Sequence, residues 1–206
     1  MKQLPFLLIL LVSLKCFSQV RIHVHLDSAI QRTITGRIYV YTSSDTVKGV
    51  PNSPDVANPE PMFATNVKDW NPSKIVTLDD AADAFSTPLS KLKPGVYKVA
   101  GVVDGNPEER GSFNPGSYYS SKEARLEVSA DGKGEAHLYL NREPKRTFKE
   151  NDSLKLVELK SGLLSAFRKK DIFIKAAIVL PENYWKDTSQ IYPVVYIIPG
   201  WGNNNF

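Results

Sequence analysis

The chain has 206 residues and a mass of 23.0 kDa, and its composition is near the globular average, with 42% hydrophobic and 23% charged residues. These values exclude a disordered or collagen-like chain, and the length allows one large domain or two small ones. The 26 Lys and Arg residues exceed the 22 Asp and Glu residues, but they are spread along the chain instead of forming one basic patch. We therefore expect no nucleic-acid partner.

Residues 1–18 have the pattern of a secretory signal peptide. A charged start is followed by an apolar run from Leu4 to Leu14 and by small side chains at Cys16 and Ser18. A run of about eleven residues fits the hydrophobic part of a signal peptide and is too short for a bilayer, which takes about 20. We predict cleavage after Ser18 and a secreted or periplasmic protein with no stable membrane anchor. Lys15, directly before Cys16, disfavours a lipoprotein anchor on that cysteine.

Residues 19–145 have the pattern of an immunoglobulin-like β-sandwich. Short stretches alternate apolar and polar side chains with a period of two, which is typical of half-buried antiparallel strands. These stretches are residues 21–26, 37–42, 74–78, 96–104, 123–129 and 135–140. The sequence Asp131-Gly132-Lys133-Gly134 predicts a hairpin between the last two of them. Residues 47–72, rich in proline, predict an extended surface loop, and residues 79–85 a single helical turn.

One short motif in this domain is more specific. Leu92-Lys93-Pro94-Gly95-Val96-Tyr97 resembles the tyrosine corner of immunoglobulin-like and fibronectin-like sandwiches. In that corner a tyrosine hydroxyl bonds to the backbone a few residues upstream and fixes the turn into the next strand. We predict this structural role, and no chemistry, for Tyr97.

Two groups of side chains are candidates for binding in the sandwich. His23 and His25 stand two apart on one strand and share a face, as a metal pair requires. His137 looks isolated and no third ligand is visible, so a polar strand face is the simpler interpretation and we expect no metal or cofactor. Aromatic side chains in predicted loops can stack on sugar rings, although they more often cover a core. These aromatic residues are Trp70, Phe113, Tyr118 and Tyr119.

The pattern changes after a charged linker at residues 146–152. Residues 154–160 and 172–180 predict two strands, joined by a loop that contains Arg168-Lys169-Lys170. Residues 194–198 are five consecutive apolar residues, which is typical of a strand buried on both faces of a largely parallel sheet. The sequence offers no helices to cover such a sheet. We therefore predict that residues 194–198 lie exposed and favour aggregation.

Two motifs in residues 153–206 point to a family. The first is Ile178-Val179-Leu180-Pro181-Glu182-Asn183-Tyr184, and the second is Tyr192-Pro193-Val194-Val195-Tyr196-Ile197-Ile198-Pro199-Gly200-Trp201-Gly202. Together they resemble the opening of the esterase D / enterochelin esterase family of α/β-hydrolases. Members of this family often carry an N-terminal sandwich domain. The resemblance implies that residues 153–206 are the incomplete N-terminal part of a hydrolase domain.

The resemblance also implies a chemistry, the hydrolysis of carboxylic esters by a serine nucleophile. The Gly200-Trp201-Gly202 turn then supplies backbone N–H groups to an oxyanion hole, with the Trp201 N–H as the donor. Pro199 stands where the family usually has histidine. The 206 residues contain no G-x-S-x-G motif and no histidine after His137, so a Ser-His-acid triad is absent from this sequence. We expect no hydrolytic activity from the chain as it stands.

The leading hypothesis is the N-terminal portion of a secreted ester hydrolase, truncated at Phe206. Its full-length form would act on an ester substrate, such as an acylated polysaccharide or a siderophore ester, without a cofactor. The alternative is an exported β-sandwich that binds a glycan or a protein partner, with residues 153–206 as a vestigial tail. A gene fragment with no independent role is the third hypothesis.

Overall fold

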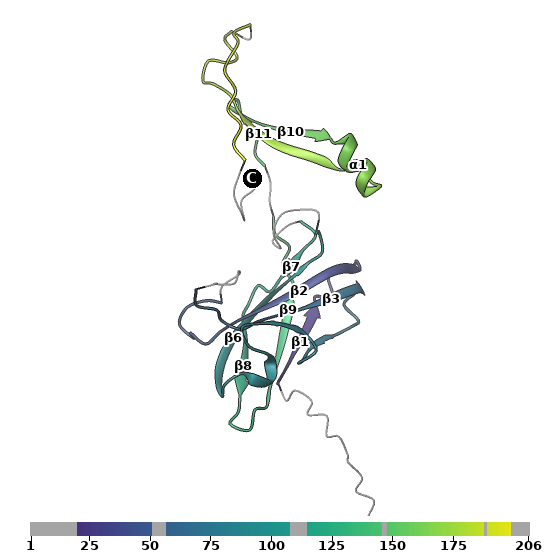
Figure 1. Cartoon of the computed structure of the whole chain (residues 1–206), viewed down its shortest axis with the longest axis vertical. Coiled ribbons are helices and arrows are strands. Elements are labelled where there is room, and N and C mark those ends of the chain that lie inside the picture. The colour runs from purple at the N-terminus through teal and green to yellow at the C-terminus, as the bar shows by residue number, and fades with distance from the viewer. Residues whose placement is uncertain (1–19, 51–56, 108–114, 146–147, 188, 199–206) are drawn as a thin grey trace, which may run out of the picture.

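The computed structural model describes residues 20–50, 57–107, 115–145, 148–187 and 189–198 (Figure 1). The chain is mainly β, as predicted. Within the described residues the strands form three sheets. The strands are β1 (Val20–Leu26), β2 (Ile34–Ser43), β3 (Met62–Trp70), β4 (Val76–Leu78), β5 (Asp83–Phe85), β6 (Gly95–Asp104), β7 (Tyr118–Tyr119), β8 (Ala124–Val128), β9 (Gly134–Leu140), β10 (Leu154–Lys160) and β11 (Phe173–Val179).

Two of these sheets pack into a β-sandwich. The larger has the order β5-β3-β2-β6-β7, with β8 also paired to β6, and the smaller has the order β4-β1-β9. All six strands predicted for the sandwich are present, with bounds that differ by one to three residues. Their period of two has the expected cause, since alternate side chains of each strand enter the core.

Among the described residues, one hydrophobic core lies between the two sheets and takes side chains from both. On β1, Val20, Ile22, Val24 and Leu26 are all buried, and burial of each such side chain contributes about 1.5–3 kcal/mol. The predicted tyrosine corner is confirmed: the Tyr97 hydroxyl donates to the Lys93 carbonyl at 3.0 Å. A short 3₁₀ turn, Leu89–Lys91, precedes it.

The prediction of an extended loop over residues 47–72 is wrong for its second half. There β3 forms, pairs antiparallel with β2 and β5, and buries four side chains. The buried residues are Phe63, Ala64, Val67 and Trp70. Their spacing is not strictly two, because the β2–β3 register shifts between Ile34 and Gly36 and Asp69 has a positive φ of 48°. A bulge of this kind hides a strand from a search for strict alternation. Residues 79–85 likewise form a turn and then β5, and not a helical turn.

The turn at Asp131-Gly132-Lys133-Gly134 is present, but it does not join neighbouring strands of one sheet. β8 pairs with β6 and β9 pairs with β1, so the turn carries the chain from the large sheet to the small one. The β1–β9 pairing is parallel, and the expectation of a purely antiparallel sandwich is wrong at this edge. These are the first and last strands of the sandwich, and with no hairpin between them a parallel pairing is possible.

Residues beyond the linker form a separate two-stranded sheet that stands apart from the sandwich in Figure 1. β10 and β11 pair antiparallel in continuous register, from Leu154 opposite Val179 to Lys160 opposite Phe173. Both strands were predicted, but the connection between them is not only a loop. It contains the helix α1 (Gly162–Arg168).

Helix α1 starts and ends for local reasons. The Ser161 hydroxyl accepts a hydrogen bond from the Leu164 N–H at 3.2 Å, which caps the N-terminus. Lys169 ends the helix in the left-handed conformation, with φ 54°. No helix among the described residues is long and apolar enough to cross a membrane.

Residues 194–198 form no strand, contrary to the buried strand predicted from their composition. Their side chains are 70–91% exposed, as the prediction of an uncovered segment requires. No sheet or helix covers them within the described part of the chain. Apolar composition alone therefore does not make a strand without neighbours to pair with and pack against.

Candidate functional site

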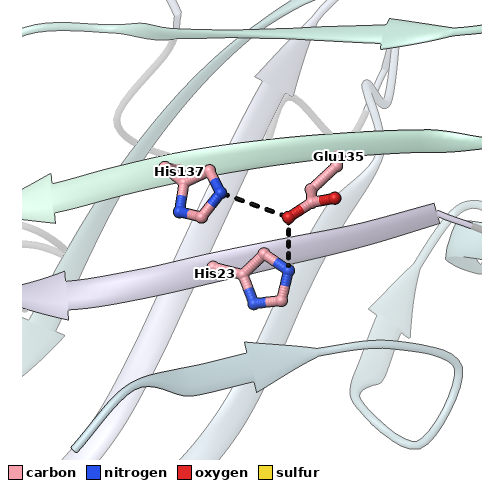
Figure 2. A group of neighbouring side chains, drawn as sticks. All are labelled: His23, Glu135 and His137. Carbon is pink, nitrogen blue, oxygen red and sulfur yellow. Dashed lines mark hydrogen bonds and ion pairs between the residues drawn. The ribbon is translucent and has the colours of Figure 1, made fainter.

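The outer face of the small sheet gathers chemically active side chains from β1 and β9. Because β1 buries Ile22 and Val24, the residues between and beside them, His23 and His25, point outward. In the same way Glu135 and His137 alternate with the buried residues of β9. The parallel register places His23 directly opposite His137. Two His and one Glu thus meet across the β1–β9 seam (Figure 2).

The Glu135 carboxylate bridges one nitrogen of each imidazole ring (Figure 2). Its Oε1 atom is 3.1 Å from Nε2 of His23 and 3.2 Å from Nε2 of His137. The rings of His23 and His137 stack with centroids 4.9 Å apart. The three ligand-type atoms all lie within 4.8 Å of one another, which is the spacing of a group that can hold a metal ion.

Each imidazole has a second partner at its other ring nitrogen. Nδ1 of His23 is 2.9 Å from the Thr77 hydroxyl of β4, and Nδ1 of His137 is 2.9 Å from Nε2 of His25. These contacts fix the direction in which both Nε2 atoms point, because a ring held at one nitrogen cannot turn freely. His25 also stacks on the Tyr139 ring, with centroids 4.6 Å apart.

Burial lowers the pKa of the His25 imidazole, and its interaction with His137 and His23 lowers it further. The neutral form of His25 is therefore favoured, and it can donate or accept the hydrogen bond with His137. The His23 side chain is 19% exposed, whereas those of Glu135 and His137 are 63% and 50% exposed. The cluster is thus open to solvent on one side and anchored on the other.

The structure changes the sequence-based view of the histidines. The prediction that His137 is isolated is wrong, because it contacts both His23 and His25. Sequence reasoning also missed Glu135, although the Glu-x-His spacing places both side chains on one strand face. The predicted pair, His23 and His25, does share a face, but the close partner of His23 comes from the other strand.

Two of the four aromatic residues considered for sugar stacking lie in the core. Trp70 is 2% exposed, and its Nε1 donates to the Lys74 carbonyl at 2.7 Å, while Tyr118 is 9% exposed. Neither presents a ring face wide enough for a sugar. Arg142 lies over the half-buried ring of Tyr119. Phe113 lies outside the described residues.

The residues tied to ester hydrolysis and export lie outside the described residues. These are Gly200, Trp201 and Gly202 of the predicted oxyanion turn, and the predicted signal peptide at residues 1–18 with Cys16. Both assignments remain predictions from the sequence.

No protein-family model matches the chain, and no curated protein matches it. Among solved structures, the major pilin from Streptococcus pyogenes is similar at 12% sequence identity and a TM-score of 0.23. That match covers 78% of this chain and 70% of the pilin chain. A TM-score this low has no bearing on function.

Proposed function

We propose that the chain is the N-terminal part of a secreted carboxylic-ester hydrolase of the esterase D / enterochelin esterase type. The observation that carries the proposal is the pair of motifs at residues 178–184 and 192–202, with their leucine–proline, tyrosine–proline and glycine–x–glycine elements. The substrate class is a carboxylic ester, with acyl groups on a polysaccharide or a siderophore ester as candidates.

The fold of the first motif is compatible with this proposal. Leu180, which follows β11, donates its N–H to the Ser153 carbonyl at 2.7 Å, so the motif leaves β11 at the open end of the hairpin, opposite α1. Trp185 Nε1 then donates to the Asp152 carbonyl at 2.7 Å. The motif residues therefore fold back onto the start of β10 as a defined turn.

The exposed apolar surface of the hairpin also supports the proposal. Large apolar side chains of β10, α1 and β11 are 41–87% exposed. They are Leu159, Leu163, Leu164, Phe167, Phe173, Ile174, Ile178 and Val179. So many exposed large apolar side chains in one short hairpin are unusual for a soluble domain that has its full set of elements. A hydrolase sheet extended by further strands and covered by helices would bury it.

The chemistry would be divided between this chain and residues that its sequence does not contain. By resemblance, the Trp201 N–H would stabilise the negative oxygen of a tetrahedral intermediate. The nucleophile, the acid and the base must come from elsewhere, since no G-x-S-x-G motif occurs in the 206 residues. All three histidines belong to the cluster on the sandwich.

The first test is to sequence the source DNA across codon 206 and several hundred bases downstream. The proposal expects an open frame that encodes a glycine-flanked serine, then an acid, then a histidine. The complete protein should hydrolyse 4-nitrophenyl acetate or methyl ferulate, and replacement of that serine by alanine should abolish the activity. A stop after codon 206, or a complete protein that hydrolyses no ester, would contradict the proposal. A binding role for the sandwich would then be the function left to test.

A matched pair of variants in the complete protein tests the oxyanion assignment. Trp201→Pro removes the backbone N–H, whereas Trp201→Phe keeps it together with an aromatic ring. Loss of one oxyanion donor lowers kcat by about 10²–10³-fold. We expect that loss from Trp201→Pro with little change in KM, and near-normal kcat from Trp201→Phe. Equal activity of the two variants would show that Trp201 is not the donor, without bearing on the ester chemistry.

A further inference from the structure

We propose that His23, His137 and Glu135 bind a divalent transition-metal ion of the Zn²⁺ class at the β1–β9 seam. The inference concerns the sandwich alone and does not depend on ester hydrolysis. It rests on three ligand atoms that lie close together and come from two strands. The two histidine rings are also held in place by outer partners.

The first argument is the spacing of the ligand atoms. An ion with ligands about 2.1 Å away holds them about 3.4 Å apart in tetrahedral geometry and about 3.0 Å apart in octahedral geometry. The Glu135 Oε1 atom is already 3.1 and 3.2 Å from the two Nε2 atoms. Closing the remaining distance, within 4.8 Å, takes only small side-chain rotations of His23 and His137. The main chain is already in place because the two histidines are direct cross-strand partners.

The second argument concerns what lies between the nitrogen and oxygen atoms. Without an ion, both short contacts to Glu135 require a proton on Nε2, since two lone pairs would otherwise face each other. A cation bound by all three atoms replaces these protons. The proton of each imidazole then sits on Nδ1, where Thr77 and His25 can accept it at 2.9 Å. Both partners can either donate or accept, so the network serves the cluster with or without the ion.

The third argument is that each histidine has a hydrogen-bond partner at its second ring nitrogen. Metal-binding histidines typically give the N–H of their other ring nitrogen to a fixed acceptor, which sets the tautomer and the ring orientation. His23 has such an acceptor in Thr77 and His137 has one in His25. Stacking of His25 on Tyr139 holds that acceptor in turn. A polar strand face with no binding role would not need this arrangement at both histidines.

The donor atoms select the kind of ion. Two imidazoles and a carboxylate suit Zn²⁺ and Cu²⁺, whereas Ca²⁺ and Mg²⁺ prefer oxygen ligands throughout. With three protein ligands and solvent on the open side, a fourth position falls to water. The ion would also join the first and last strands of the sandwich, whose ligands stand at positions 23 and 137. The ion would therefore hold the parallel strands β1 and β9 together.

The experiment measures Zn²⁺ binding to the 206-residue chain by calorimetric titration after chelator treatment. We expect one ion per chain and a rise in the unfolding temperature, because an ion that binds the folded state stabilises it. His137→Ala should weaken binding by more than about 100-fold, beyond the 10–100-fold range of outer-shell changes. Glu135→Gln should also weaken it, and Glu127→Gln, an exposed strand acid on β8, is the matched control with no expected change.

The outer partners give a second readout. Thr77→Val removes the hydroxyl that faces His23 and should weaken binding about 10–100-fold without abolishing it. Nuclear magnetic resonance of the imidazole nitrogens should show Zn²⁺ on Nε2 of His23 and His137, and a proton on Nδ1. The proposal is overturned if Zn²⁺ does not bind, or if it binds the His137→Ala and Glu135→Gln variants as tightly as the unaltered chain. Tighter binding of Ca²⁺ than of Zn²⁺ would also overturn it.

Discussion

Replacement of Tyr97 by phenylalanine tests the tyrosine corner, a motif that both the sequence and the structure identify. The change removes only the hydroxyl that donates to the Lys93 carbonyl at 3.0 Å and leaves the ring in the core, where Tyr97 is 8% exposed. A hydrogen bond of this type contributes about 1 kcal/mol net. Lys93 lies at the surface, so water can replace the lost donor and no further penalty for a buried carbonyl is added. We expect a loss of about 1 kcal/mol and a fall of about 4 °C in Tm.

Urea unfolding followed by circular dichroism, with chelator present, measures this loss as a lower midpoint at an unchanged slope. Tyr139→Phe is the matched control, since its side chain is 54% exposed and the change should stay within about 0.5 kcal/mol. If Tyr97→Phe costs no more than the control, the hydroxyl does not hold the corner. The assignment of the motif would then rest on ring packing alone.

Two further predictions concern the sandwich. A Cβ at Gly101 would lie 2.7 Å from Cδ2 of the buried Leu138, so Gly101→Ala should cost about 1–3 kcal/mol of unfolding free energy in the same urea assay. Hydrogen bonds from Lys133 and Ser129 lower the pKa of Asp131 to about 2 from its ordinary 3.8. Because the folded-state pKa is the lower one, this stabilisation is complete above pH 4 and is lost as the pH falls toward 2. A titration of the Asp131 carboxyl by nuclear magnetic resonance should give a midpoint near 2, and a midpoint near 3.8 would contradict the contacts.

Alternation of apolar and polar residues predicts those strands whose two faces differ clearly. β1 and β9 are such strands, with one face in the core and the other in water. A search for alternation does not detect β3, because the register shift between Ile34 and Gly36 and the left-handed conformation of Asp69 break its pattern. The error for residues 194–198 is the opposite one, since the sequence predicts a strand that does not form. Their composition favours a strand, but strand formation depends on partners that no local pattern can supply.

The candidate site shows the same limit more sharply. The spacings His23-x-His25 and Glu135-x-His137 are visible in the sequence, and each places two side chains on one strand face. That these two faces meet depends on a parallel pairing between the first and last strands of the sandwich. A contact between positions 23 and 137 is set by the whole topology. Local spacing can therefore identify candidate ligands, but it cannot predict that they meet in the fold.

The uncovered apolar segment at residues 194–198 predicts self-association of the chain. Five consecutive apolar side chains that are 70–91% exposed, without charge, can pair with the same segment of another copy. Val195→Lys with Ile197→Lys should reduce concentration-dependent association in sedimentation velocity, because lysines blunt an exposed edge and repel each other. Both side chains are more than 80% exposed, so the stability of the sandwich should not change. Val47→Lys, at a 91% exposed position in the sandwich, is the control that adds charge elsewhere. Equal relief by the control would mean that net charge, and not this segment, governs association.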